Sequence, residues 1–567
     1  MKPKTKAKII FFCASIIFIL LCIYTLKNMS YTDNEPIYIM AGYYYITEGE
    51  TFYTGHPILT HIISALPLLF IEVDTPDPAE IYHPFEFSRK EWLYYGDNNP
   101  DQIIFLARLP FIFLSLVFAW YLFRWTRELF GLVPGAVALF FYIFNPDIIW
   151  NSVVVMTDMA VAGFMFISCY YLWKYLKEEK KRHLILTGIF FGLAISSKST
   201  ALFILPVYLA MFILYRKKDL KKILKDSVYI GLIAILLFSL MGLAEIAPIY
   251  NQENPFYFKY EGSRSDERLQ TLAEDYTENE LFQKIIIVSL RDIPLAGASS
   301  IQAYVSQFKH AVDGHAQYFL GEYNQHGVWY YYLGGYLIKT PIVLLLSFAL
   351  SFVFWKKLKA KDWKDELTLL LPIGITLIIF SLILRLNLGL RHTLLILLFM
   401  MLCAAKVYQW EKWKSKIWKW CLGIFLIWYM LSSLIIAPYY IPYFNEFVGQ
   451  NNGPEYMLDT SVDLGQDLIN LKEFMDTNNI TEVKLRYGGF ENATERNISY
   501  TPLTSCEPEK GIYAISVNVL YGQFWHEGIK PDFNFTCYAW LREMEPIERI
   551  GYSIYIYNIT ETDIDNI

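Results

Sequence analysis

The chain has 567 residues, of which 54% are hydrophobic and 17% aromatic, and its mean hydropathy is +0.29. This composition indicates an integral membrane protein with some soluble mass. The formal net charge is −6, and the sequence contains no basic domain, zinc-ligand spacing or aromatic-basic strand pattern, which excludes a nucleic-acid-binding protein.

Four lysines precede the first apolar run, which extends from about residue 9 to residue 26: Lys2, Lys4, Lys6 and Lys8. No small-residue cleavage site follows, so this run is predicted to be a first span with a cytoplasmic N-terminus. Ten further spans are predicted at about 102–123, 129–149, 157–173, 184–197, 200–215, 226–246, 331–355, 366–384, 392–408 and 417–437. With eleven alternating spans, the connections rich in Lys and Arg all fall on the cytoplasmic side.

The predicted fold is therefore a polytopic α-helical membrane protein with its C-terminus outside the cytoplasm. A transmembrane domain would occupy residues 1–437, with a first outer loop at 31–101 and a large outer loop at 247–330. Residues 58–71 are too short and proline-interrupted to span, which favours a re-entrant or interfacial segment. Residues 438–567 are predicted to form a small outer α/β domain, with a helix near 464–477 and strands near 482–487, 511–520 and 553–559.

Two cysteines and six glycosylation triplets agree with this topology. Cys506 and Cys537 lie in the C-terminal region and could form a disulfide outside the cytoplasm. The acceptor asparagines all fall on predicted outer segments: Asn28, Asn479, Asn492, Asn497, Asn534 and Asn558.

Residues 32–60, TDNEPIYIMAGYYYITEGETFYTGHPILT, follow the first span and carry the carboxylates Asp33 and Glu35. Asn34 can cap a helix whose first turn holds Glu35 and Pro36. An apolar face at helical spacing follows, so we predict a helix on the membrane surface with two carboxylates at its N-terminus. The helix dipole favours their ionised form, as a general base requires. A capped interfacial helix without catalytic function is the alternative interpretation.

Ionisable residues also occur where predicted spans meet the outer face, a position where such groups usually serve a functional site: Asp158, Lys198, Arg391 and His392. Together with Asp33 and Glu35 they predict one outward-facing pocket. Its cations suit a lipid phosphate, and a facing carboxylate suits deprotonation of an acceptor hydroxyl. The histidines show no metal-ligand spacing, so no metal site is predicted, although Asp33, Glu35 and Asp158 could share a divalent cation.

Several long motifs in order resemble the protein-O-mannosyltransferase-like family 39 of the C-type glycosyltransferases. The stretch DNEPIYIMAGYYY…GHPILTHIISALPLL is similar to the family's FDEPxHxxxGxxY…EHPPLxKxLAALPLL. The others are ARLPFI (107–112), GIFFGLAISSKSTALFILP (188–206), YFLGEYNQHGVWYYYLGGYLIKTP (318–341), GLRHTL (389–394) and YFNEFVGQNNGPEYMLDTSVDLGQDL (443–468). Residues 329–332 read WYYY, unlike the WWDYG of oligosaccharyltransferases.

The resemblance implies transfer of one sugar, mannose or another hexose, from a polyprenyl or dolichyl phosphate to an acceptor outside the cell, with inversion. It implies that Asp33 or Glu35 is the base and that Asp158 assists it or binds sugar hydroxyls. The donor phosphate would contact Lys198, Arg391 and His392, and a substrate groove would include His56, Glu322 and Trp329. No cofactor other than the lipid-linked donor is implied, and the resemblance favours an archaeal plasma membrane.

The sequence departs from the family pattern in this same first loop. Glu35 occupies the family's Glu, Asn34 stands where its Asp is expected, and Asp33 lies one residue early. Gly55 and Ile58 replace the Glu and second Pro of EHPP. An inactive partner subunit is thus one alternative, and a flippase or transporter for a lipid-linked sugar is another. The sugar, the acceptor, the carrier length and the oligomeric state are left open.

Overall fold

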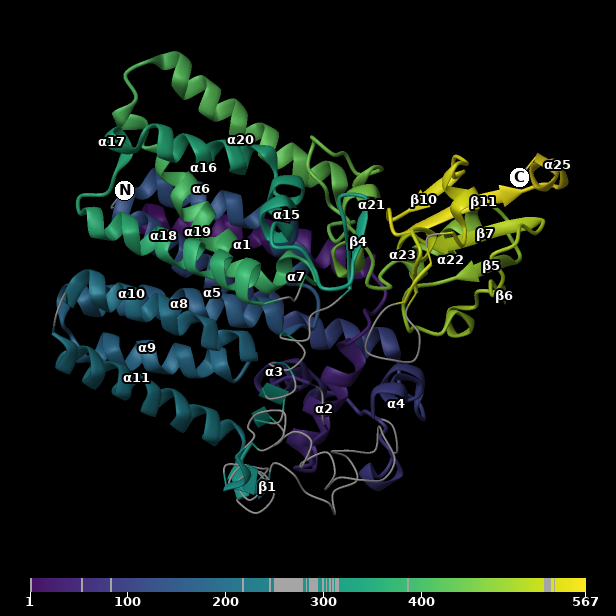
Figure 1. Ribbon diagram of the computed structural model, residues 1–567, viewed down its shortest axis with the longest axis horizontal. Helices are drawn as coiled ribbons and strands as arrows, with labels where there is room; N and C mark the ends of the chain where they lie inside the picture. Colours follow the sequence, from purple (N-terminus) through teal and green to yellow (C-terminus); the bar gives the residue numbers. More distant parts are fainter. Residues whose placement is uncertain are drawn as a thin grey trace.

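The computed structural model describes residues 3–52, 55–81, 84–216, 219–243, 246–248, 279–281, 283–284, 294–297, 300–301, 303–304, 307, 311, 316–384, 387–524, 532–534 and 536–566. Helices form a bundle, and a small sheet domain lies at one end of it (Figure 1). The N-terminus lies at the opposite end of the bundle from this sheet domain, as expected for a chain that starts on one side of a membrane and ends on the other.

Within these ranges, eight helical segments are long and apolar enough to cross a membrane. They are α1 (Pro3–Lys27), α5 (Pro100–Phe130), α8 (Thr157–Glu178), the 3₁₀ helix η4 with α10 (Ser199–Ile204, Leu205–Arg216), α11 (Leu220–Met241), α18 with η5 (Trp363–Ile378, Ile379–Ile383), η6 with α19 and η7 (Leu390–Thr393, Leu394–Ala405, Lys406–Tyr408) and α20 (Lys416–Ile436). A ninth would be the pair α15 (Tyr331–Lys339) and α16 (Ile342–Val353), which is bent by 115°.

The other two predicted spans are helical but short. Residues 129–149 form α6 (Leu132–Ile143) and α7 (Pro146–Asn151), and residues 184–197 lie mostly in α9 (Lys181–Ile195). The 12 residues of α6 extend about 18 Å, well below the thickness of a hydrocarbon core. Gly131, with φ of +101°, ends α5 and starts α6, and Pro146 begins a new turn, so this segment folds back instead of crossing in one rod.

Helices α2 (Glu35–Thr47), α3 (Leu59–Ala65) and α4 (Pro84–Lys90) form a layer at the sheet end of the bundle (Figure 1). The predicted helix over the DNEP stretch is confirmed as α2, and it is more enclosed by protein than a single apolar face requires. Every residue from Glu35 to Gly42 is buried, because α3, α4 and α5 pack around it. Asn34 precedes the helix without a capping hydrogen bond from its side chain.

The C-terminal α/β domain is present as predicted. Its five-stranded sheet has the order β10-β11-β7-β5-β6, formed by Glu548–Ile550, Ile554–Ile559, Gly511–Ser516, Val483–Arg486 and Tyr500–Pro502. β5 is parallel to β6 and β7, whereas β11 is antiparallel to β7 and β10. Helix α22 (Leu468–Thr477) packs Leu468, Leu471 and Met475 against this sheet. The predicted strand at 511–520 ends at Ser516, where α23 (Val517–Leu520) begins.

Short elements complete the described chain. They are η1 (Leu66–Phe70), η2 (Pro78–Glu80), η3 (Trp92–Tyr94), β1 (Ile246–Pro248), β2 (Pro294–Ala296), β3 (Gln317–Phe319), β4 (Glu322–Asn324), α17 (Trp355–Leu358), η8 (Trp410–Lys412), α21 (Gly453–Tyr456), η9 (Asp459–Ser461), η10 (Ala493–Arg496), β8 (Gln523–Phe524), β9 (Asp532–Phe533), α24 (Ala539–Arg542) and α25 (Glu561–Asn566). Much of the predicted loop at 247–330 lies outside the described residues.

Cys506 and Cys537 are joined in a disulfide, as the sequence allowed. The five acceptor asparagines of the C-terminal domain are all exposed: Asn479, Asn492, Asn497, Asn534 and Asn558.

Candidate active site

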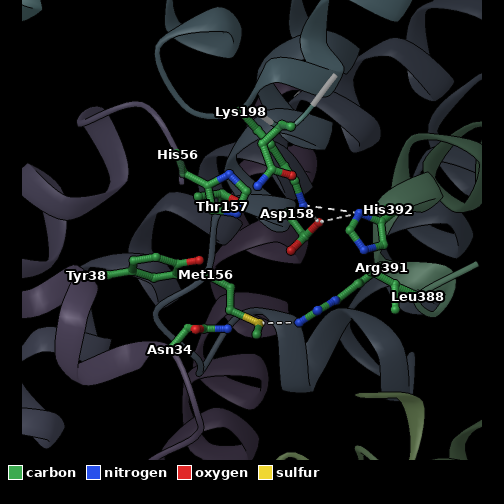
Figure 2. Close-up of a pocket in the computed structure, with 11 residues that line it drawn as sticks. Asn34, Tyr38, His56, Met156, Thr157, Asp158, Lys198, Leu388, Arg391 and His392 are labelled. Atoms are coloured by element: carbon green, nitrogen blue, oxygen red, sulfur yellow. Dashed lines mark hydrogen bonds and ion pairs between the residues drawn. The ribbon is translucent and has the colours of Figure 1, made fainter. Parts of the chain in front are cut away.

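A cavity of about 150 Å³ lies where α2, the start of α8 and the start of the α19 span meet (Figure 2). It is lined by Asn34, Tyr38, His56, Met156, Thr157, Asp158, Lys198, Gln307, Leu388, Arg391 and His392. Four of the residues that the sequence singled out as ionisable groups at span ends are therefore brought together: Asp158, Lys198, Arg391 and His392.

Asp158 is the centre of a polar cluster in this cavity. It lies in the first turn of α8, where the helix dipole favours a negative charge. The Nζ of Lys198 lies 2.6 Å from Asp158 Oδ1 and 3.2 Å from His392 Nδ1. Side chains of all three are about 95% buried. The Lys198 ammonium donates to both partners. Because its charge is opposite to that of Asp158, the Asp158–Lys198 ion pair has little net charge.

Arg391 makes fewer strong hydrogen bonds in this cavity than Lys198 does. Its Nη1 donates to the Sδ of Met156 at 3.2 Å, and a thioether sulfur is a weak acceptor. Its Nε has no hydrogen-bond partner among the described residues. Arg391 and Tyr38 reach into the cavity from opposite sides (Figure 2). The guanidinium therefore retains donors for an anion.

Asp33 and Asn34 stand next to each other but face different surroundings. Asn34 lines the cavity, whereas Asp33 is not among the described lining residues and forms an ion pair with Arg89 of α4. The Asp33 side chain is 31% exposed. Burial raises the pKa of Asp33, and the nearby Arg89 and Arg391 guanidinium groups oppose this rise. Asp33 is therefore an ion-paired carboxylate whose pKa is nevertheless raised, and a raised pKa favours proton acceptance.

Glu35 is held away from the cavity. Its Oε1 accepts from Arg108 Nε and the backbone N–H of Val155, each at 2.8 Å. Its Oε2 accepts from Arg108 Nη2 at 2.6 Å and from the Thr32 N–H at 2.8 Å. The Glu35 and Arg108 side chains are 0% and 1% exposed. Glu35 thus ties α2 to α5 and to the residues before α8, and it is not among the described residues that line the cavity.

His56 follows Gly55 at the cavity wall. Burial and the neighbouring Lys198 charge hold the pKa of His56 well below its usual value, so its imidazole is neutral. Gly55 has φ of +74°, a conformation that glutamate rarely adopts. The glycine at this position of the EHPP-like motif is therefore required by the local backbone.

Glu322 and Trp329, the other predicted groove residues, are exposed and do not occur among the described residues that line the cavity. Glu322 begins β4, and Trp329 is 60% exposed. Within the described ranges no three His, Cys, Asp or Glu side chains gather as they would around a metal. In this structure Glu35 binds Arg108, Asp158 binds Lys198 and Asp33 binds Arg89.

Sequence reasoning missed several residues of this region. Tyr38, Met156, Thr157 and Leu388 look like ordinary residues of apolar spans and their ends, and nothing in the sequence distinguishes them. Arg108 is different, because an arginine within a predicted span is itself a signal for a buried partner. Arg89 lies in a polar loop and carries no such signal.

Comparison with known families gives one match. Residues 101–242 match the family described as dolichyl-phosphate-mannose-protein mannosyltransferase, which confirms over this segment the resemblance seen in the motifs. No curated protein sequence matches the chain significantly.

Two solved proteins illustrate the structural likenesses. ArnT from Cupriavidus metallidurans, bound to undecaprenyl phosphate, has 9% identity and a TM-score of 0.46, with 97% of this chain and 98% of that chain covered. The Archaeoglobus fulgidus oligosaccharyltransferase in its apo form has 12% identity and a TM-score of 0.44, with 83% of this chain covered. The match spans only 58% of the A. fulgidus enzyme's length.

Proposed function

From the family match over residues 101–242 and the geometry of the cavity, we propose that this chain is a membrane glycosyltransferase that uses a lipid-phosphate carrier. It would move a single sugar, mannose or another hexose, from a polyprenyl or dolichyl phosphate to an acceptor hydroxyl outside the cytoplasm. The observation that carries this proposal is the cavity itself, where a buried carboxylate and two cations converge.

The cationic half of the cavity suits the donor phosphate. Arg391 has donors left for phosphate oxygens, and Lys198 lies on the same side with His392 (Figure 2). The phosphodiester of the donor carries one negative charge, and the departing lipid phosphate gains a second. Fixed cations stabilise that developing charge without reorganisation.

The transfer step then needs one proton acceptor. The acceptor oxygen would form a bond to the anomeric carbon and lose its proton to Asp33. The bond from that carbon to the phosphate oxygen would break, and its electron pair would remain on the phosphate, so no general acid is required. Asp158, whose pairing with Lys198 makes it a weak base, would hold sugar hydroxyls or assist Asp33.

We favour Asp33 over Glu35 as the base, because the Glu35 oxygens already accept four hydrogen bonds in the interior. Glu322 and Trp329 would contribute to an acceptor groove farther from the cavity. We further propose residues 1–437 as the transmembrane domain and 438–567 as the extracytoplasmic domain of a plasma-membrane protein, with the exposed sequons as glycosylation sites.

The decisive measurement is transfer of labelled sugar from polyprenyl-phosphate mannose by purified wild type, Asp33→Asn, Asp158→Asn, Glu35→Gln and Arg391→Met. We expect Asp33→Asn to lose at least about 100-fold in kcat with donor affinity retained, because general base catalysis contributes that much. Arg391→Met should weaken donor binding and turnover together. Asp476→Asn, which changes a surface carboxylate on α22, is the matched control.

Other outcomes separate the remaining interpretations. Loss of transfer in Asp158→Asn with full activity in Asp33→Asn would assign the base to Asp158. Donor binding without turnover for any sugar would instead favour a partner subunit or a flippase.

A further inference from the structure

Arg89 of α4 connects the segment before α2 to the C-terminal domain. Its Nε donates to the carbonyl oxygen of Asp33 at 3.0 Å, its Nη2 donates to Asn34 Oδ1 at 3.3 Å, and it forms an ion pair with the Asp33 carboxylate. The ring of Phe490, from the C-terminal domain, lies 3.9 Å from the guanidinium carbon. The Arg89 side chain therefore contacts Asp33 and Asn34 as well as the C-terminal domain.

These contacts fix Asp33 in two ways. Because Arg89 binds both the backbone carbonyl and the side-chain carboxylate of Asp33, it restrains the chain and the side-chain rotation together. The Arg89 side chain is only 15% exposed, and Phe490 stacks on it as a cation–π partner. A planar guanidinium with several donors suits this role better than an ammonium would.

Further hydrogen bonds hold the same segment against the C-terminal domain. The Ser30 N–H donates to the Gln466 carbonyl at 2.9 Å, and the Ile469 N–H donates to Ser30 Oγ at 3.0 Å. The Nδ2 of Asn470 donates to the Asn28 carbonyl at 3.1 Å. The Asp33 N–H also donates to the Leu464 carbonyl at 3.4 Å, so hydrogen bonds to residues 464–470 run along residues 28–33. Arg89 adds restraints on the Asp33 carboxylate and on Asn34.

We propose that Arg89 is a positioning residue that holds the Asp33 carboxylate in place for proton transfer, and that Phe490 of the C-terminal domain holds Arg89. This inference rests on the proposed function and adds a coupling between the C-terminal domain and the catalytic loop.

The charged and titratable groups around Asp33 determine what removal of Arg89 does to the pH profile. Arg89 on α4 and Arg391 at the start of the α19 span both favour the ionised carboxylate, and Tyr38 on α2 is the nearby phenol. Loss of one of the two cations raises the pKa of Asp33 further. The acid limb of the kcat/KM profile then moves to higher pH.

The test compares Arg89→Met, Arg89→Lys, Phe490→Ala and Phe490→Leu with wild type in sugar transfer, donor binding and hydrogen exchange. Arg89→Met should lose about 100-fold in kcat, the cost of a base misplaced by about 1 Å, while donor affinity stays within about twofold. Its acid limb should shift upward, and residues 28–34 should exchange faster. Arg89→Lys should recover part of the loss, and Phe490→Leu should be less affected than Phe490→Ala.

Arg549→Met is the matched control, because Arg549 also stacks on an aromatic ring of the C-terminal domain, Tyr555 at 5.3 Å, without contacting residues 28–34. An active wild type with an Arg89→Met variant of unchanged kcat and pH profile would overturn the inference and leave the proposed function intact. Unchanged exchange at residues 28–34 would overturn it regardless of activity. A wild type that transfers sugar from no donor would remove the proposed function, whereas the exchange measurement still reports the restraint by Arg89.

Discussion

At the scale of single residues, the Glu35–Arg108 pair shows that an acidic residue in a catalytic-looking motif can serve the fold. Each Glu35 oxygen accepts two hydrogen bonds, and both partners are enclosed. A buried charge that loses its partner is strongly destabilising, because the remaining ion has no water to solvate it.

We therefore expect Glu35→Gln to lower the free energy of unfolding by about 3–5 kcal/mol, because it leaves Arg108 buried without a counter-charge. Thermal unfolding of the wild type and Glu35→Gln in detergent measures this loss of stability. The double variant Glu35→Gln/Arg108→Met should recover part of the loss, as coupled sites do. If Glu35→Gln unfolded like wild type yet transferred no sugar, Glu35 would have to be assigned a catalytic role after all.

Asp467 of the C-terminal domain gives a prediction about pH. Burial raises the pKa of this carboxyl from 3.8 to about 7, although Ser553 and Asn470 donate hydrogen bonds to it. A raised pKa means that the folded state favours the protonated acid. Stability is then greatest below the unfolded pKa and is lost as pH rises through 7, by up to about 4 kcal/mol at about 1.4 kcal/mol per unit.

The measurement is the unfolding temperature of wild type and Asp467→Asn between pH 5 and 8. Wild type should become less stable across this range, and Asp467→Asn should show a smaller slope because its amide does not titrate. Burial raises the pKa of Asp463 as well, so a residual slope of the same sign is expected. Identical slopes in the two proteins would contradict this assignment.

At the scale of elements, helices α2 and α3 are packed so closely that a glycine is required between them. A Cβ on Gly42 would overlap the His61 carbonyl of α3, a backbone atom that cannot move independently. Gly42→Ala should therefore destabilise the protein by about 1–3 kcal/mol through overpacking. Gly231→Ala on α11, where nothing lies within 4 Å of the added Cβ, should be neutral or stabilising by up to about 1 kcal/mol.

Unfolding temperatures of the two glycine variants test this directly. A Gly42→Ala protein as stable as Gly231→Ala would show that α2 and α3 can separate without cost. It would also weaken the role assigned to α2 as a rigid support for Asn34 and Tyr38.

The same elements show what could be predicted from sequence. Apolar runs identified the long apolar helices of the described chain but not short helices such as α4, α21 and α24. The ionisable residues at the ends of the spans identified the polar half of the cavity, because such residues are costly in a membrane without a function. The burial of α2 on all sides could not be predicted, since α3, α4 and α5 cover its second face only in the folded chain. Arg89 could not be predicted either, because its partners come from two distant parts of the sequence.

At the scale of the whole molecule, the helical bundle has two different ends, one with the N-terminus and one with the sheet domain (Figure 1). Lys198 and Asp158 form a buried pair at the cavity, but another buried pair, Glu366 with Lys406, lies in the bundle away from it. Polar groups in the interior are thus evidence for function only where a cavity accompanies them.

The hydrogen bonds between residues 28–30 and residues 466–470 also impose an order on biosynthesis. Asn28 and Asn470 are separated by 442 positions along the chain. The loop that would supply the base leaves the ribosome among the first segments, but its bonding partners are made more than 400 residues later. We therefore expect residues 28–30 to reach their final arrangement only near the end of synthesis, after the membrane-spanning helices have been made.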